Sequence, residues 1–307
     1  MKRFLVLVFV IDCLVSLAIY YYPDKPQISR SLPIDTSLYI ASKGYTNSTP
    51  KRTFGTLLTS LPLGVIKTVA GTERASFSTT QTITDTLSVF LPKNEYTIAV
   101  VGDSMIDTLG PEIPDLKVEL ARLLPTKSFH ILNYGAGATD AENGLKRLTQ
   151  GYTYLGEAKS AVLSVHPDIV VIESFAYNHW GNTPADRDRQ WLTLAKMVET
   201  VKSESPQTSV VIAATIAPYC STYTDGSANL PPERKQSECA TVKKYLENAV
   251  EFAKSQNLPL ADVYHPSLIE QEGNPRYINQ GDHIHPSEEG RHFFAKILAT
   301  TLIRVIH

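Results

Sequence analysis

The chain has 307 residues, of which 43% are hydrophobic and 20% charged, and its formal net charge is −2. This composition is ordinary for a globular protein and excludes a fibrous or wholly disordered chain. The near-zero charge argues against a broad nucleic-acid-binding surface, and three cysteines are too few for a disulfide-dense miniprotein or a four-cysteine zinc site.

The N-terminus carries a lysine and an arginine ahead of an apolar run that continues to Tyr22. The run is long enough for a helix that crosses a bilayer, which needs about 20 residues, and the cations favour export of the rest of the chain. A cleaved signal peptide is the close alternative, because small residues around Ala18 suit a signal peptidase. Asp12 weakens both interpretations and leaves a buried cytosolic element as the third. We expect residues 1–22 to be a transmembrane anchor or a signal peptide, and the protein to be membrane-anchored facing outside the cytoplasm, or secreted.

Residues 23–95 are rich in serine, threonine and proline. We expect an extension that acts as a tether. Its last part, residues 79–91, is rich in threonine, valine, phenylalanine and isoleucine, which favours short strands.

From residue 96 the pattern changes to short, almost continuous apolar runs that alternate with helix-like segments. Such runs are typical of buried strands, and we expect them at residues 98–102, 129–132, 168–173, 209–214 and 258–262. The expected helices are residues 116–124, 141–148, 184–202, 242–255 and 287–306, the last with Ser287 as its N-cap. This alternation predicts one domain over residues 96–307, a parallel sheet with helices on both faces. Ligands of such sheets gather beyond the carboxyl ends of the strands.

Two cysteines, Cys220 and Cys239, lie in this domain, and Cys13 lies in the apolar run. In an oxidising compartment Cys220 and Cys239 could form a disulfide. Two free thiols stay open as the alternative, because pairing requires a geometry that the sequence does not show.

The strongest sign of chemistry is the pair Asp282 and His285, in a polar loop before the last expected helix. The two residues are three positions apart, so one tight turn can bring the carboxylate to the imidazole. A serine hydroxyl needs an adjacent imidazole to take its proton, and the carboxylate fixes the tautomer of that imidazole. Ser104 stands at the end of the first expected strand, after Gly102 and Asp103, where a plain helix-capping role is the alternative.

Two more segments follow strand ends. Gly137 and Ala138 lie in a run of small residues after the second expected strand, where a backbone N–H can approach a substrate closely. Asn178 follows the third strand, and its amide can donate a hydrogen bond to a developing oxyanion. Taken singly, a glycine-rich turn or a loop asparagine is more often structural. Their order along the chain favours a shared site.

The chain resembles the SGNH (GDSL-type) hydrolase family in four motifs, Gly102-Asp103-Ser104, Asn133-x-Gly135, Asn178 and Asp282-x-x-His285-Pro286. The resemblance covers residues 96–307 and no part of the extension. Three positions depart from the family pattern. Ala138 stands where the family usually has an oxyanion-hole glycine, and Ala176 and His179 stand where the third motif usually has a glycine and an aspartate.

The resemblance implies a three-layer α/β/α flavodoxin-like sandwich and an ester-cleaving serine hydrolase that uses no metal or organic cofactor. Ser104 would be the nucleophile and would lend its N–H to the oxyanion hole. The N–H of Gly137 or Ala138 and the side chain of Asn178 would complete the hole. His285 would be the general base and then the general acid, oriented by Asp282.

Other interpretations of the same residues stay open. Asp282, His283 and His285 could be metal ligands of a metallohydrolase. The domain could be a surface module that binds a glycan and has lost catalysis. The same triad could also transfer an acyl group to a polymer hydroxyl instead of water.

The substrate is predicted from position alone. Tyr177 and Trp180 follow the third strand and could contact a sugar ring or an acyl group, although ordinary packing is the alternative and Trp191 is expected in the core. Residues 218–232 predict a long loop at the rim of the pocket. We expect an O-acetyl esterase of cell-envelope or secreted polysaccharide first, and a lipase or thioesterase second. No nucleic-acid partner is expected, and the membrane is a partner through residues 1–22.

Overall fold

The structure, a computed structural model, describes residues 93–306. The expected anchor over residues 1–22 and nearly all of the expected extension over residues 23–95 lie outside the described residues and stay predictions. Within residues 93–306, no helix has both the length and the apolar character that crossing a membrane requires.

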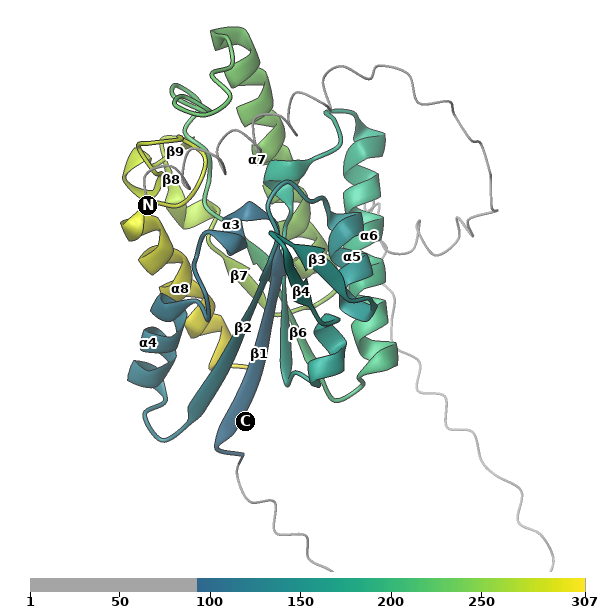
Figure 1. Cartoon of the computed structure of the whole chain (residues 1–307). Helices are drawn as coiled ribbons and strands as arrows, with labels where there is room; N and C mark the ends of the chain where they lie inside the picture. The colour runs from purple at the N-terminus through teal and green to yellow at the C-terminus, as the bar shows by residue number, and fades with distance from the viewer. Residues whose placement is uncertain (1–92, 307) are drawn as a thin grey trace, which may run out of the picture. The chain divides into compact units, whose positions relative to one another are not determined.

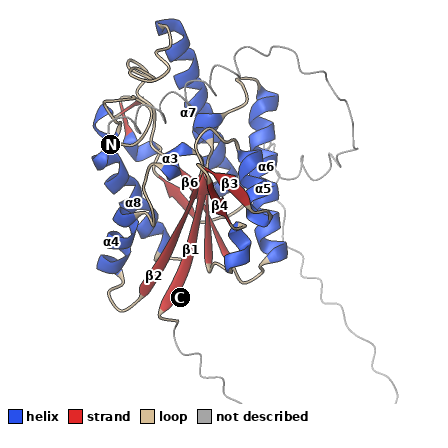
Figure 2. Ribbon diagram, viewed as in Figure 1, coloured by secondary structure: helices blue, strands red, loops and turns tan. Residues whose placement is uncertain are grey.

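A five-stranded parallel sheet forms the centre of the described domain (Figures 1 and 2). In spatial order its strands are β2 (Ser128–Gly135), β1 (Glu95–Gly102), β5 (Ile169–Glu173), β6 (Ser209–Ala214) and β7 (Leu260–Asp262). All five expected strands are confirmed. The order is that of flavodoxin-like sheets, and it places a topological switch point between β1 and β5, beyond whose carboxyl ends ligands bind.

Helices cover both faces of the sheet (Figure 1). On one face lie α4 (Pro114–Leu123) and α8 (Glu288–Leu302), and on the other lie α5 (Ala141–Thr149), α6 (Pro184–Glu204) and α7 (Pro232–Ser255). The side chains of β1 alternate between the two cores. Ile98 and Val100 are buried with the first set of helices, and Ala99 and Val101 with the second. The prediction of a parallel sheet between two helical layers is confirmed.

Helix α7 begins at Pro232, well before the expected residue 242. Its first turns carry no apolar periodicity, so no helix was predicted there. They are stabilised instead by a proline at the first helical position and by an ion pair of 2.8 Å between Arg234 and Glu238. Helix α8 has Ser287 as its N-cap, as expected, but ends at Leu302 rather than near residue 306.

Several short elements were not expected. They are the helix α3 (Ser104–Asp107), the 3-10 turns η1 (Val162–Val165), η2 (Ala176–Asn178), η3 (His265–Ser267) and η4 (Pro275–Tyr277), and the hairpins β3 (Tyr152–Tyr154) with β4 (Glu157–Lys159) and β8 (Leu268–Ile269) with β9 (Glu272–Gly273). Most of them lie beyond the carboxyl ends of the sheet strands, where they shape the candidate site.

Two glycines let α3 rest directly on the ends of β1 and β2. A Cβ atom added at Gly102 would lie 2.3 Å from the side chain of Ile106, and one added at Gly135 would lie 2.2 Å from the backbone nitrogen of Asp107. No side chain fits at either position. Glycine is therefore required at both strand ends for the helix that begins with Ser104 to sit there.

Candidate active site

Ser104 is the first residue of α3, at the carboxyl end of β1. The preceding residue, Asp103, is fully buried and is the N-cap of this helix, since its Oδ1 accepts the N–H of Met105 at 2.8 Å. The N–H of Ser104 lies in the first turn and has no partner within the helix. The capping role that the sequence left as an alternative thus belongs to Asp103 and leaves the Ser104 side chain half-buried at the sheet edge.

Asp103 also connects two candidate site segments. Its Oδ2 accepts a hydrogen bond of 2.9 Å from the side-chain amide of Asn178, which lies in η2 after β5. Burial raises the pKa of Asp103, and the hydrogen bonds from Asn178 and Met105 and the charges of His285 and Arg147 oppose this increase. A positive charge on His285 thus acts on the carboxylate that precedes Ser104.

The structure brings Asp282 and His285 together in one turn. Oδ2 of Asp282 lies 3.0 Å from Nδ1 of His285, and Oδ1 accepts the N–H groups of Ile284 at 2.9 Å and His285 at 3.0 Å. Burial raises the pKa of Asp282, but the three hydrogen bonds and the His285 charge outweigh it, so the pKa lies below its ordinary value. With Asp282 ionised, Nδ1 of His285 is the donor, and Nε2 is left to accept a proton.

The segment after β2 passes close to Ser104. A Cβ atom added at Gly137 would lie 3.7 Å from Cβ of Ser104. The N–H of Gly137 donates to the hydroxyl of Tyr154 at 2.8 Å, so it is already engaged. Ala138 is exposed and has a left-handed backbone with φ of 56°, and its N–H has no hydrogen-bond partner among the described residues. Of the two candidate oxyanion donors, Ala138 is the better placed.

Two buried residues of this edge were not predicted from the sequence. Arg147 of α5 is 4% exposed and donates to the carbonyls of Tyr134 at 2.6 Å and Gly102 at 3.0 Å, which ties the ends of β2 and β1 together. Glu173, the last residue of β5, accepts from the Ser174 hydroxyl and from the N–H of Phe175. Burial, and then the charge of Asp103, raise the pKa of Glu173 well above its ordinary value.

The candidate substrate contacts Tyr177 and Trp180 have partners within the protein. The hydroxyl of Tyr177 donates to the carbonyl of Ile216 at 3.1 Å, and Nε1 of Trp180 donates to Asp140 at 3.0 Å. The guanidinium of Arg189 lies 4.3 Å from the Trp180 ring centroid. Their role toward substrate therefore stays a prediction. Trp191 is 4% exposed and lies in the core, as expected.

The sequence contains a second Asp-x-x-His-Pro segment, which was not among the predicted site residues. Nδ1 of His265 lies 2.8 Å from Oδ2 of Asp262, much as in the first pair. Nε2 of His265, however, lies 3.1 Å from Glu247, so a carboxylate occupies the nitrogen that would have to receive a serine proton. The structure thus distinguishes two turns that look alike in sequence.

His283 does not join Asp282 and His285 in a ligand cluster. Its Nδ1 lies 2.9 Å from the carbonyl of Asp225, in the loop between β6 and α7. Among the described residues, the cluster whose donor atoms are close enough to hold a metal is Cys220, Cys239 and Glu272, and its two cysteines form a disulfide with Cα atoms 5.3 Å apart.

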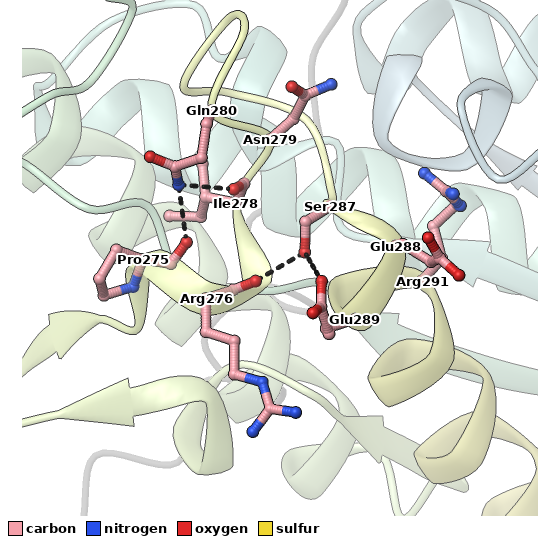
Figure 3. Close-up of a pocket in the computed structure, with 9 residues that line it drawn as sticks. All are labelled: Pro275, Arg276, Ile278, Asn279, Gln280, Ser287, Glu288, Glu289 and Arg291. Atoms are coloured by element: carbon pink, nitrogen blue, oxygen red, sulfur yellow. Dashed lines mark hydrogen bonds between the residues drawn. The ribbon is translucent and has the colours of Figure 1, made fainter.

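A cavity of about 560 Å³ is formed by residues that flank the Asp282–His285 turn in the chain, and none of the candidate catalytic residues lines it (Figure 3). Its lining comes from both sides of the turn, namely Pro275, Arg276, Ile278, Asn279, Gln280, Ser287, Glu288, Glu289 and Arg291. The N–H of Asn279 donates to the carbonyl of His285 at 2.8 Å, which joins the cavity wall to the turn.

Comparisons with known proteins agree with the observed fold. The model of the GDSL-like lipase/acylhydrolase family matches residues 100–292, a range that holds all the candidate catalytic residues. No curated protein matches the chain. The structure of the lipase/acylhydrolase from Enterococcus faecalis is similar with a TM-score of 0.50 at 21% identity, over 69% of this chain and 97% of that one. A GDSL-like lipase from Bacteroides thetaiotaomicron has a TM-score of 0.48 at 16% identity, over 68% and 89% of the two chains.

Proposed function

Because this chain belongs to the GDSL-like lipase/acylhydrolase family and is a serine ester hydrolase, we propose that Ser104, His285 and Asp282 are its catalytic triad. The observation that carries the proposal is the Asp282–His285 hydrogen bond of 3.0 Å, which engages Nδ1 of a half-buried imidazole and leaves its Nε2 to accept a serine proton. The second Asp-His pair is not used, because Glu247 occupies its other ring nitrogen.

The proposed reaction has two halves. Oγ of Ser104 attacks the ester carbonyl while Nε2 of His285 takes its proton, and Asp282 stabilises the imidazolium. His285 then returns the proton to the departing alcohol, which leaves an acyl group on Ser104. A water molecule, deprotonated by His285, attacks this acyl-enzyme, and the acid departs as Ser104 recovers its proton.

The oxyanion of each tetrahedral intermediate would be held by three donors. They are the N–H of Ser104, the N–H of Ala138 and the side-chain amide of Asn178. The Asn178 amide carries two hydrogens, and Asp103 uses one of them, so the other is available to the oxyanion. Such donors stabilise the transition state more than the ground state.

We further propose an O-acetyl ester of a cell-envelope or secreted polysaccharide as the substrate, with the protein membrane-anchored or secreted. The apolar run before residue 23 and the Cys220–Cys239 disulfide support an oxidising compartment.

The test is a series of p-nitrophenyl esters of increasing acyl length, together with acetylated glycans, assayed with the wild type and with Ser104→Ala. We expect acetyl esters to give the highest kcat/KM and Ser104→Ala to be inactive. A steady increase of kcat/KM with chain length would favour a lipase or thioesterase instead. Transfer of acetyl to an added sugar in place of free acetate would identify an acyltransferase. Cell fractionation with and without carbonate extraction tests the proposed location.

A further inference from the structure

The loop between β6 and α7, residues 215–231, lies against the turn that carries Asp282 and His285. We propose that this loop is a positioning element for the catalytic turn, and that the Cys220–Cys239 disulfide must be intact for it to act. The inference rests on the proposed triad.

Three hydrogen bonds join the loop to the turn. The hydroxyl of Ser227 donates to the carbonyl of Asp282 at 2.9 Å. Nδ1 of His283 lies 2.9 Å from the carbonyl of Asp225, and the N–H of Thr224 donates weakly to the carbonyl of His283 at 3.4 Å. The loop therefore contacts both residues that begin the turn.

The two backbones also pack against each other. Gly226 has φ of 77°, and a Cβ atom added there would lie 2.2 Å from the carbonyl oxygen of Gly281, the residue before Asp282. Only glycine allows this approach. The main chains of the loop and the turn are thus in direct contact at Gly226 and Gly281, with no side chain between them.

The turn needs such support. His283 has a left-handed backbone with φ of 54°, a conformation that is unfavourable for a residue with a side chain. Residues hold such conformations when their surroundings over-determine them. Loop 215–231 supplies three of those surrounding hydrogen bonds, and Asn279 supplies further backbone bonds to the turn.

The loop is in turn fixed to α7 at two points, Cys220 and Asp225. The disulfide joins Cys220 to Cys239 of α7, and Asp225 pairs with Lys235 of the same helix. The N–H of Cys220 donates to Glu272 at 3.2 Å, and Glu272 pairs with Lys243 of α7 at 2.9 Å. Without the disulfide, this part of the loop would lose its covalent link to α7 and keep the link through Glu272 and the apolar cluster that holds Tyr223 and Val242 of α7.

A loosened loop would let the turn move, which lowers the fraction of molecules with His285 in reach of Ser104. Misplacement by about 1 Å can cost up to about 100-fold in rate. Because His285 takes part in the proton transfers and not in holding the bound substrate, the loss should fall on kcat and leave KM nearly unchanged.

The experiment compares Ser227→Ala and the pair Cys220→Ser with Cys239→Ser against the wild-type full chain, with Ser221→Ala as the matched control. Ser221 is exposed in the same loop, and the loop's hydroxyl bond to the turn comes from Ser227 instead. Each protein is assayed with p-nitrophenyl acetate for kcat and KM, and with a fluorophosphonate for the labelling rate of Ser104. We expect Ser227→Ala to lower kcat and labelling about 3- to 10-fold, and the cysteine pair at least about 10-fold, with KM within about twofold.

Wild-type kcat in both Ser227→Ala and the cysteine variant would overturn the inference, as would equal losses in Ser221→Ala. A second measurement covers the case in which the cysteine variant does not fold. The folded wild type is treated with a phosphine reductant well below its melting temperature and then reoxidised. We expect a reversible loss of kcat with unchanged far-UV circular dichroism, and full activity of the reduced protein would contradict the proposal. The triad itself is tested apart from this, since activity in Ser104→Ala would remove the proposed function regardless of the loop.

Discussion

The side-chain amide of Asn178 donates a hydrogen bond of 2.9 Å to Oδ2 of Asp103. Asp103 caps the helix that begins with Ser104, so this bond couples the proposed oxyanion donor to the proposed nucleophile. A single buried carboxylate thus fixes the relative position of two groups that come from different strands.

We expect Asn178→Ala to lower kcat by about 100- to 1,000-fold, equivalent to about 2.7–4 kcal/mol, with a small change in KM. Asp103→Asn should lower kcat less, because it places an amide against the Asn178 amide and misorients it without removing it. Steady-state kinetics with p-nitrophenyl acetate checks both. An effect of Asn178→Ala confined to KM would refute the oxyanion role.

The two Asp-x-x-His-Pro segments offer a matched pair of variants. Asp282→Asn should reduce kcat by up to about 10⁴-fold with little loss of stability, because the tautomer of His285 is no longer fixed. Asp262→Asn makes the same chemical change in the other segment and should leave kcat unchanged. Comparable losses of kcat in the two variants would show that the contact between His265 and Glu247 does not separate the structural pair from the catalytic one.

Tyr154 of the β3–β4 hairpin holds the N–H of Gly137 and donates to Oδ2 of Asp107 at 2.7 Å. Tyr154→Phe should lower kcat several-fold, because the segment that presents the Ala138 N–H loses a fixed point. Tyr96→Phe, a buried tyrosine at the amino end of β1 and away from the strand ends that carry the site, is the control and should leave kcat unaltered. Identical kinetics of Tyr154→Phe and wild type would remove the hairpin from the site.

Arg147 is a stability determinant in its buried position. Its guanidinium donates hydrogen bonds to the carbonyls of Gly102 and Tyr134 and to the hydroxyl of Thr139. Arg147→Met would remove these buried hydrogen bonds and leave the Gly102 carbonyl with the N–H of Ala136 alone, and we expect a loss of about 2–4 kcal/mol in the free energy of unfolding. Lys146→Met, at the exposed neighbouring position, should change it by less than about 0.5 kcal/mol in urea titrations.

His179 predicts a pH dependence of stability. Burial lowers its pKa below the ordinary 6.5, against the charges of Glu238 and Asp186, and its Nδ1 has no hydrogen-bond partner among the described residues. As the pH falls through 6.5, the unfolded chain takes up a proton that the folded protein does not, so stability is lost below that pH. The melting temperature should fall less between about pH 7 and pH 5.5 in His179→Gln than in the wild type. His130→Gln, at an exposed position, should follow the wild type.

The sheet and most helices were predictable because their signals are local. Each strand is a short buried run, and Ser287 marks the start of α8 in the sequence itself. The Asp282–His285 pair was predictable because its two members are three residues apart. The start of α7 was not, since its first turns are polar and depend on an ion pair and on Cys239.

The features that could not be predicted depend on contacts between distant segments. Arg147 looks like any surface arginine until its partner carbonyl at Gly102, far away in the chain, is known. The hairpin β3–β4 has a mostly exposed, polar sequence without a clear alternation, and its importance comes from the Tyr154 hydroxyl meeting Gly137. The roles of the two Asp-His pairs were separable only by Glu247, which lies on α7.

The left-handed backbone of Ala138 is unfavourable for a residue with a side chain. A glycine at this position would be free to leave the left-handed conformation before an ester arrives, whereas an alanine held there by its neighbours has few other states to visit. The cost of this conformation is met once, when the chain folds, and the proposed oxyanion donor would then be in place at the start of each catalytic cycle. Turnover should therefore depend little on any ordering of this segment by the substrate.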